Sequence, residues 1–242
     1  MHRFYLSGQV NRDTITVSDA EQLHHMRDVL RLKPGDEVAV FDEAGNDCRC
    51  TIASLDKKQA VLSVSECRTF QPKPGKLAIA CAVPKMSKMD DIIDKLTQLG
   101  VDEIIPLKTE RVIVKMDESG ERLERWRKIA RSASEQSQRN LLPVVTPVRS
   151  LPEVLALAQG YELKLIPTLE GPRQDLQSFF KGTVPRSVLA LIGPEGDFTP
   201  EEISQAIQAG LVPVSLGEAV LRVDTAAIAI AAYLHFALEA ER

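Results

Sequence analysis

The sequence predicts an α/β protein with a small N-terminal β-barrel and a larger C-terminal domain built on a parallel sheet. Short β-rich runs at even spacing fill residues 1–70, a pattern typical of a small barrel. Two prolines and a glycine follow at residues 71–75, where neither a helix nor a central strand can continue. Apolar runs then alternate with helical stretches over residues 76–242, which favours a parallel sheet covered by helices.

The elements of the barrel follow from local signals. A helix is expected from Ser18 to Leu30, with Ser18 as N-cap and Glu21 as its capping-box partner. Turn signals separate the β-rich runs, for example the Pro-Gly pair within residues 33–36. The expected strands of this domain are residues 4–6, 14–17, 37–41, 48–52 and 60–64.

The C-terminal domain alternates strongly between strand and helix signals. Its last helix is apolar nearly all round, so we expect it to be buried inside the domain or at a subunit interface. The expected strands are residues 77–83, 104–107, 163–167, 189–192 and 214–216, and the expected helices are 87–99, 118–138, 151–158, 175–180, 200–209 and 225–239.

Two of these apolar runs end in glycine turns, at Gly193 and at Gly217. Because the two strands are close in sequence, we expect their ends to lie side by side in the sheet. Ligands of open α/β sheets bind beyond the carboxyl ends of the strands, so a ligand site is expected there. The sequence contains neither a dinucleotide fingerprint nor a P-loop. The turns therefore favour a neutral or cationic ligand held by backbone groups and walled by Ile192, Leu216 and Leu221.

Composition limits the class of partner. The formal net charge of −4 argues against capture of nucleic acid by bulk charge. No apolar run is long enough to span a membrane, and the first residues lack the apolar core of a signal peptide, so we expect a cytoplasmic protein without a membrane partner. The four cysteines and four histidines complete no zinc pattern. We expect no bound metal.

A local basic segment nevertheless exists at residues 108–140, with nine basic and six acidic side chains. Helical spacing pairs Glu121 with Arg125 and Glu124 with Lys128. Arg127 and Arg131 share a helix face and have no such partner at helical spacing. An ordinary solvated helix face is the alternative interpretation. In residues 1–70 nine basic and eleven acidic side chains balance, which gives RNA binding there little support. The candidate RNA contacts are Arg111, Arg127, Arg131 and Arg139 in the segment, and Arg3, Arg12, Arg27 and Arg31 before it.

Several segments together resemble one family. Residues 192–196 and the pattern Leu216-Gly217-x-x-x-Leu221-Arg222-x-x-Thr225-Ala226 resemble the C-terminal signatures of the RsmE family, bacterial uracil-N3 methyltransferases of the SPOUT superfamily. Residues 24–31, 95–101, 125–130 and 135–139 also look like family segments, so the resemblance covers nearly the full chain. Three positions depart from the pattern: Asp197 where a glycine is usual, and Gln98 and Asp224 where glutamate is usual.

The resemblance implies a fold that periodicity does not predict. It implies that residues 76–242 form a SPOUT α/β domain with a deep trefoil knot, that residues 1–70 form a PUA-like RNA-binding barrel, and that residues 71–75 link them. It also implies a homodimer and S-adenosylmethionine bound in the knotted loops. The implied cofactor-binding residues are Thr168, Leu169, Ile192, Gly193, Pro194, Glu195, Gly196, Leu216, Gly217, Leu221 and Arg222.

The implied reaction is methylation of uracil N3 at uridine 1498 of 16S ribosomal RNA, with the small ribosomal subunit as partner. Uracil N3 is a poor nucleophile until its proton leaves, so the site needs a base or a cation that stabilises the uracil anion. Arg222 suits the second role because it is always charged. Glu195 or Asp224 could be the base, although Glu195 could instead bond loop amides and Asp224 could cap the last helix.

Two other functions remain open at this point. One is a SPOUT methyltransferase with a different RNA target. The other is a catalytically silent RNA-binding or ribosome-assembly factor that keeps the fold. Binding of S-adenosylmethionine separates the enzymes from the silent factor.

Overall fold

The computed structural model describes residues 1–8, 10–11, 13–71, 75–85, 88–112, 120–169, 171–181 and 185–239. The chain divides into two compact units, one formed by Met1–Lys73 with Ser134–Leu142 and the other by Pro74–Ala133 with Pro143–Arg242. Most of the expected linker, and the candidate RNA contact Arg12, lie outside the described residues. None of the described helices is long and apolar enough to cross a membrane.

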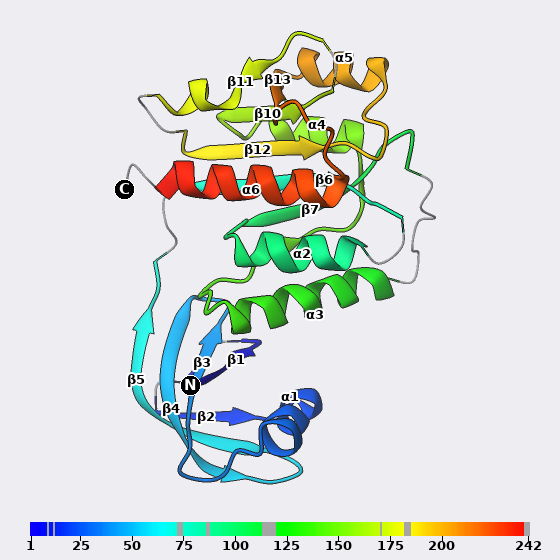
Figure 1. Ribbon diagram of the computed structural model, residues 1–242. Coiled ribbons are helices and arrows are strands. Elements are labelled where there is room, and N and C mark those ends of the chain that lie inside the picture. Colours follow the sequence, from blue (N-terminus) through cyan, green and yellow to red (C-terminus); the bar gives the residue numbers. More distant parts are fainter. Residues whose placement is uncertain are drawn as a thin grey trace. The chain divides into compact units, whose positions relative to one another are not determined.

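The N-terminal unit contains one five-stranded sheet in the order β1-β3-β4-β5-β2 (Figure 1). Strand β1 pairs in parallel with β3, and the other neighbours pair antiparallel. Its inward side chains form a separate core that includes Phe4, Val40 and Leu62. The strands are β1 (His2–Leu6), β2 (Thr14–Val17), β3 (Glu37–Asp42), β4 (Asn46–Leu55) and β5 (Ala60–Thr69), each containing the run expected from the sequence.

The expected helix over residues 18–30 is corrected in two respects. It begins as α1 (Ala20–His24) with Asp19 as N-cap, whose carboxylate accepts from the Gln22 amide at 2.8 Å. Aspartate caps as well as serine does, so the cap lies one residue later than Ser18. The helix then widens into a π-helical turn, His25–Val29, in which Met26 is fully buried.

A disulfide links two strands of this unit. Cys48 on β4 lies directly opposite Cys67 on β5, and their sulfurs are bonded. No pattern in the sequence predicted this pairing. The other two cysteines are free and buried, and burial, with a contribution from Asp47, raises the pKa of the Cys50 thiol to about 11.

Residues 134–142 belong to this unit through contacts with β1. The Arg3 guanidinium donates to the Arg139 carbonyl at 2.8 Å and to the Asn140 side chain, forms an ion pair with Asp47 at 3.3 Å, and lies 4.3 Å from the centre of the Phe41 ring. Only 6% of the Arg3 side chain is exposed. This arginine therefore holds the unit together, and its guanidinium is not available to RNA as the charge pattern suggested.

The C-terminal unit contains an eight-stranded sheet in which every pairing is parallel. The main order is β11-β13-β10-β12-β6-β7-β8, and β9 also pairs with β7. The strands are β6 (Lys76–Ala82), β7 (Glu103–Lys108), β8 (Val144–Val145), β9 (Arg149–Ser150), β10 (Leu163–Pro167), β11 (Gln174–Asp175), β12 (Ser187–Ile192) and β13 (Val212–Ser215). The parallel α/β sheet predicted from the sequence is confirmed.

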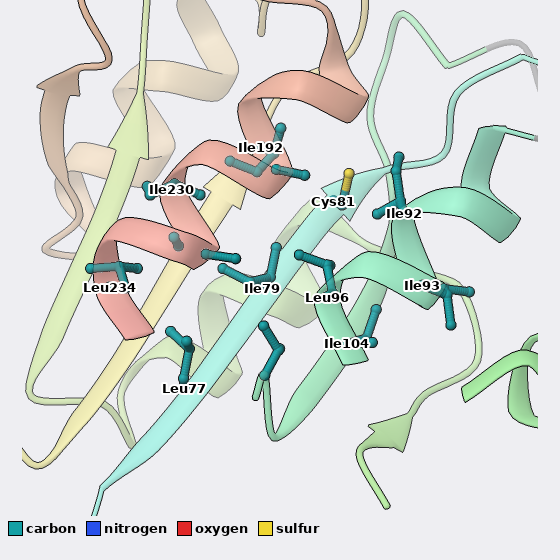
Figure 2. Close-up of a cluster of buried hydrophobic side chains, with 14 of the residues drawn as sticks. Leu77, Ile79, Cys81, Ile92, Ile93, Leu96, Ile104, Ile192, Ile230 and Leu234 are labelled. Atoms are coloured by element: carbon teal, nitrogen blue, oxygen red, sulfur yellow. The ribbon is translucent and has the colours of Figure 1, made fainter. Parts of the chain in front are cut away.

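Helices cover both faces of this sheet. One face packs against α2 (Lys88–Gln98), α3 (Glu121–Gln136) and α6 (Val223–Glu239), and the other against α4 (Leu151–Ala158) and α5 (Pro200–Gln208). Figure 2 shows the first face, where Ile230 and Leu234 of α6 and Leu96 of α2 lie over Ile79 of β6. The last helix therefore buries one stripe inside its own unit, which is one of the two locations expected from its composition.

Candidate functional site

A cavity of about 250 Å³ opens where β10, β12 and β13 end, at the carboxyl edge of the parallel sheet. The strands that carry the two glycine turns are not neighbours, contrary to the expectation from the sequence. Strand β10 lies between them, paired with β12 on one side and with β13 on the other. The chain passes from β12 through α5 and across β10 to reach β13, so three loops rather than two surround the cavity.

All eleven residues that the resemblance assigned to the cofactor line this cavity. They come from the loop after β10 (Thr168, Leu169), the loop after β12 (Ile192, Gly193, Pro194, Glu195, Gly196) and the loop after β13 (Leu216, Gly217, Leu221, Arg222). Sequence reasoning missed the remaining lining residues, which are Pro167, Arg173, Asp197, Ala219, Val220, Val223 and Ala226.

The loop after β10 is held at its start. The Thr168 amide donates to the Val214 carbonyl of β13 at 3.2 Å, and the Arg173 guanidinium donates to the Thr168 carbonyl at 3.2 Å. Thr168 is buried, whereas the next residue, Leu169, is 43% exposed at the cavity. The Leu169 amide is bound by the carboxylate of Asp197, at 2.8 Å.

The loop after β12 is a tight turn that requires glycine at two points. Gly196 has φ of +92°, a left-handed conformation that side chains disfavour. Gly193 needs to be small, because an added Cβ would stand 3.0 Å from two ring carbons of Phe198. The turn closes with a 3.0 Å hydrogen bond from the Asp197 amide to the Pro194 carbonyl.

Arg111 supports this loop from the end of β7. Its guanidinium donates to the Gly196 carbonyl and, at 3.2 Å, to the Asp197 carbonyl. Next to it, the Glu110 amide donates at 2.9 Å to the buried carboxylate of Glu202. Arg111, a candidate RNA contact on charge alone, thus lies against the wall of the cavity.

The loop after β13 carries Arg222, an exposed cation that lines the cavity. Gly217 has φ of +113°, and an added Cβ there would meet nothing within 4 Å. Arg222 ends the loop, and its carbonyl accepts from the Ala226 amide at 2.8 Å as α6 begins. Its exposed guanidinium forms no hydrogen bond or ion pair with the described part of the chain.

Two carboxylates were candidates for the base. The Glu195 side chain is exposed at the cavity and bonds none of the described loop amides. Asp224 is not the cap residue that its position suggested, since α6 begins at Val223. Its Oδ1 is buried and finds no partner among the described residues. Burial first, and then both carboxylates, raise the pKa of the Cys81 thiol, which places Asp224 and Glu195 around the end of β6.

The structure gives partners to several candidate RNA contacts. Arg127, which helical spacing left unpaired, forms an ion pair with Glu124 at 2.7 Å. Arg125, expected to pair with Glu121, bonds Asp90 of α2. In the other unit, Arg27 pairs with Asp28 at 2.6 Å, and Arg31 is exposed with φ of +56°. Arg131 and Arg139 lie at the C-terminal end of α3 and just after it and are half-buried.

Within the described ranges, no group of three or more histidine, cysteine, aspartate or glutamate side chains could hold a metal ion.

Two known families match separate parts of the chain. Residues 71–235 match a family described as "RNA methyltransferase domain", and residues 17–65 match one described as "RNA methyltransferase PUA domain". The first match contains the cavity, and the second contains most of the five-stranded sheet.

Individual relatives match nearly the full chain. Ribosomal RNA small subunit methyltransferase E of Bacillus subtilis is 32% identical over 93% of this chain and 93% of its own length. The protein of that name from Synechocystis is 37% identical over 96% of this chain and 76% of its own length. The Neisseria gonorrhoeae enzyme bound to S-adenosyl methionine superposes with a TM-score of 0.84 at 29% identity, covering 97% and 96% of the two chains. A Legionella pneumophila protein solved with the bound cofactor SAM gives 0.88 at 30% identity over 97% of each.

Proposed function

The chain belongs to the family of ribosomal RNA small subunit methyltransferase E, and we propose that it transfers the methyl group of S-adenosylmethionine to uracil N3 of 16S ribosomal RNA, at uridine 1498. One observation carries this proposal. The cavity at the carboxyl edge of the sheet is lined by all eleven residues that family resemblance assigns to the cofactor.

The residues around the cavity fit such a cofactor. Ile192, Leu216 and Leu221 offer apolar walls. Gly217 leaves open space over its α-carbon, so a flat ring can approach the backbone there. A small number of polar groups on largely apolar walls is typical of cofactor sites. Bound here, S-adenosylmethionine supplies an electrophilic methyl carbon on a sulfonium.

Residues of this chain then remove the proton from uracil N3 and stabilise the resulting anion. The N3 proton must leave before N3 attacks, and the resulting charge spreads onto the two carbonyl oxygens. The guanidinium of Arg222, which bonds no side chain or backbone group of the described residues, lies at the cavity, where it stabilises that charge. Glu195, whose exposed side chain also lines the cavity, accepts the proton. Holding N3 in line behind the methyl carbon supplies up to about 7–11 kcal/mol of the barrier reduction.

The RNA and the assembly are part of the same proposal. The PUA domain match over residues 17–65 supports an RNA-binding role for the N-terminal unit, with Arg27 and Arg31 as its candidate contacts. Val220, 75% exposed, and Leu169, 43% exposed, both line the cavity, and we propose that a second subunit covers these exposed apolar side chains in a homodimer. We propose the small ribosomal subunit as the physiological partner and the bacterial cytoplasm, where ribosomes assemble, as the location. The trefoil knot implied by the resemblance stays a prediction.

Calorimetric titration with S-adenosylmethionine, followed by methyl transfer to 16S RNA and to purified small subunits, tests the proposal. We expect saturable cofactor binding and 3-methyluridine in at least one RNA substrate. A folded protein that binds no cofactor supports the silent RNA-binding factor instead. Cofactor binding with methylation of another RNA or another atom supports a methyltransferase with a different target.

A further inference from the structure

Asp197 occupies a backbone conformation that suits glycine better than aspartate. Its φ of +67° is left-handed, and it follows Gly196 at +92°, so two successive residues of the turn are left-handed. Side chains disfavour this region, although aspartate tolerates it better than most. An aspartate here destabilises the turn unless hydrogen bonds of its side chain offset the cost of the left-handed conformation.

Each oxygen of the Asp197 carboxylate accepts a hydrogen bond. Its Oδ1 accepts from the Phe198 amide at 2.8 Å, and its Oδ2 accepts from the Leu169 amide at 2.8 Å. The first bond stabilises the turn itself. The second crosses 28 positions of sequence and joins the loop after β12 to the loop after β10. Both are charge-assisted bonds, about twice as strong as neutral ones.

The joined loops are two of the three walls of the cavity. Thr168, Leu169 and Asp197 itself line it. Arg111 fixes the backbone of this turn by donating to the Gly196 and Asp197 carbonyls. The carboxylate is thus anchored at its own backbone and able to fix the exposed Leu169 segment.

We propose that Asp197 is a positioning residue that latches the loop after β10 to the loop after β12 and so holds the cofactor cavity in its binding shape before the cofactor arrives. This inference rests on the proposed function for the identity of the ligand. A pocket held in its bound shape binds more tightly, because less ordering remains to be done on binding. The latch therefore acts on cofactor affinity rather than on the chemical step.

Two substitutions separate the latch from a plain structural role. Asp197→Gly removes both acceptors but keeps the left-handed backbone, so the turn still folds. Asp197→Asn keeps the shape but offers one acceptor for two amide donors. The matched control is Asp56→Asn, since Asp56 also accepts from two backbone amides, Lys58 at 2.6 Å and Gln59 at 2.9 Å, but in the N-terminal unit.

Calorimetry and steady-state kinetics with S-adenosylmethionine give the first test. We expect both Asp197 variants to bind about 10- to 100-fold more weakly, the loss of one charge-assisted bond. The KM for the cofactor should rise equally, with kcat at saturating cofactor and the KM for RNA within about threefold of wild type. Asp56→Asn should match wild type. Equal binding by Asp197→Gly and wild type would overturn the inference, as would a loss confined to kcat.

Amide hydrogen exchange at Leu169, measured without cofactor, gives the second test. Exchange should be at least tenfold faster in Asp197→Gly than in wild type and unchanged in Asp56→Asn. An unchanged rate at Leu169 contradicts the latch whatever the ligand is. A wild-type protein that binds no S-adenosylmethionine would instead reject the proposed function, and the exchange measurement still decides the latch.

Discussion

The α-carbon of Gly193 lies against the ring of Phe198, so that a Cβ on Gly193 would stand 3.0 Å from the Cδ2 and Cε2 atoms. Phe198 is only 2% exposed and packs in the core beneath α5, so its ring has little room to retreat. The glycine that the sequence marks as a strand-ending turn is therefore also a packing requirement of the cavity wall.

Gly193→Ala should lower the free energy of unfolding by about 1–3 kcal/mol, the usual effect of overpacking, and weaken cofactor binding by moving the wall. Urea unfolding and calorimetry measure the two effects. Gly160→Ala is the control, because its added Cβ meets only the Leu157 carbonyl at an ordinary 3.6 Å. If Gly193→Ala matched the control in both measurements, the contact would have no energetic importance.

Arg222→Ala should leave cofactor affinity within a few-fold of wild type and lower turnover by about 10²–10³-fold, the typical effect of losing one donor to a developing negative charge. Its guanidinium bonds nothing in the described part of the chain, so its removal breaks no structural contact. Arg222→Lys should recover part of the rate, because lysine keeps the positive charge but lacks the planar guanidinium with its several N–H donors. Preserved turnover in the alanine variant would remove Arg222 from the mechanism.

Because the pKa of Tyr161 is raised in the folded protein, we expect the protein to lose stability at alkaline pH. Its hydroxyl donates to Glu103 at 2.8 Å, and Lys76 pairs with the same carboxylate at 2.6 Å. Burial, opposed in part by Lys76, raises the pKa of Tyr161 from 10.0 to about 12. The unfolded chain therefore loses the proton first as pH rises, and the free energy of unfolding falls between pH 10 and pH 12.

The size of this alkaline effect is about 1–3 kcal/mol. Urea unfolding at several alkaline pH values should show a steeper decline for wild type than for Tyr161→Phe, which keeps the ring over which Lys76 lies, 5.1 Å from its centre. Parallel declines for the two proteins would mean that the hydroxyl does not titrate differently on unfolding.

The disulfide between Cys48 and Cys67 predicts two reactive thiols per chain, those of Cys50 and Cys81, when the protein is unfolded without reductant. Reduction should destabilise the N-terminal unit by about 2–4 kcal/mol, since the bond closes a loop between residues 19 positions apart. The double variant Cys48→Ala, Cys67→Ala should be insensitive to reductant. Four reactive thiols in freshly purified protein would show that the bond does not form in the cell.

The helices and strands that the sequence predicted accurately are those with strong local signals. Strands β2 and β10 and helix α4 match their expected ranges, because apolar period and turn residues are local signals. The missed relationships depend on distant parts of the chain. The placing of β10 between β12 and β13 comes from a crossover, and the joining of residues 134–142 to the N-terminal unit comes from Arg3.

The candidate site shows the same division. The cavity-lining residues could be predicted because they follow strand ends and match a family pattern. The partners of charged residues could not. Arg111 bonds the carbonyl of a residue 85 positions away, and Asp197 bonds an amide 28 positions away. Charge counted along the sequence therefore suggested RNA contacts at two arginines whose guanidinium groups bond other parts of the protein, the buried Arg3 and the exposed Arg111.

The 3-methyluridine content of 16S ribosomal RNA from a strain that lacks the gene shows whether this protein methylates uracil N3. We expect this nucleoside to disappear from uridine 1498 in the deletion strain, to return when the wild-type gene is restored, and to stay absent with Arg222→Ala. An unchanged 3-methyluridine level in the deletion strain would contradict this activity.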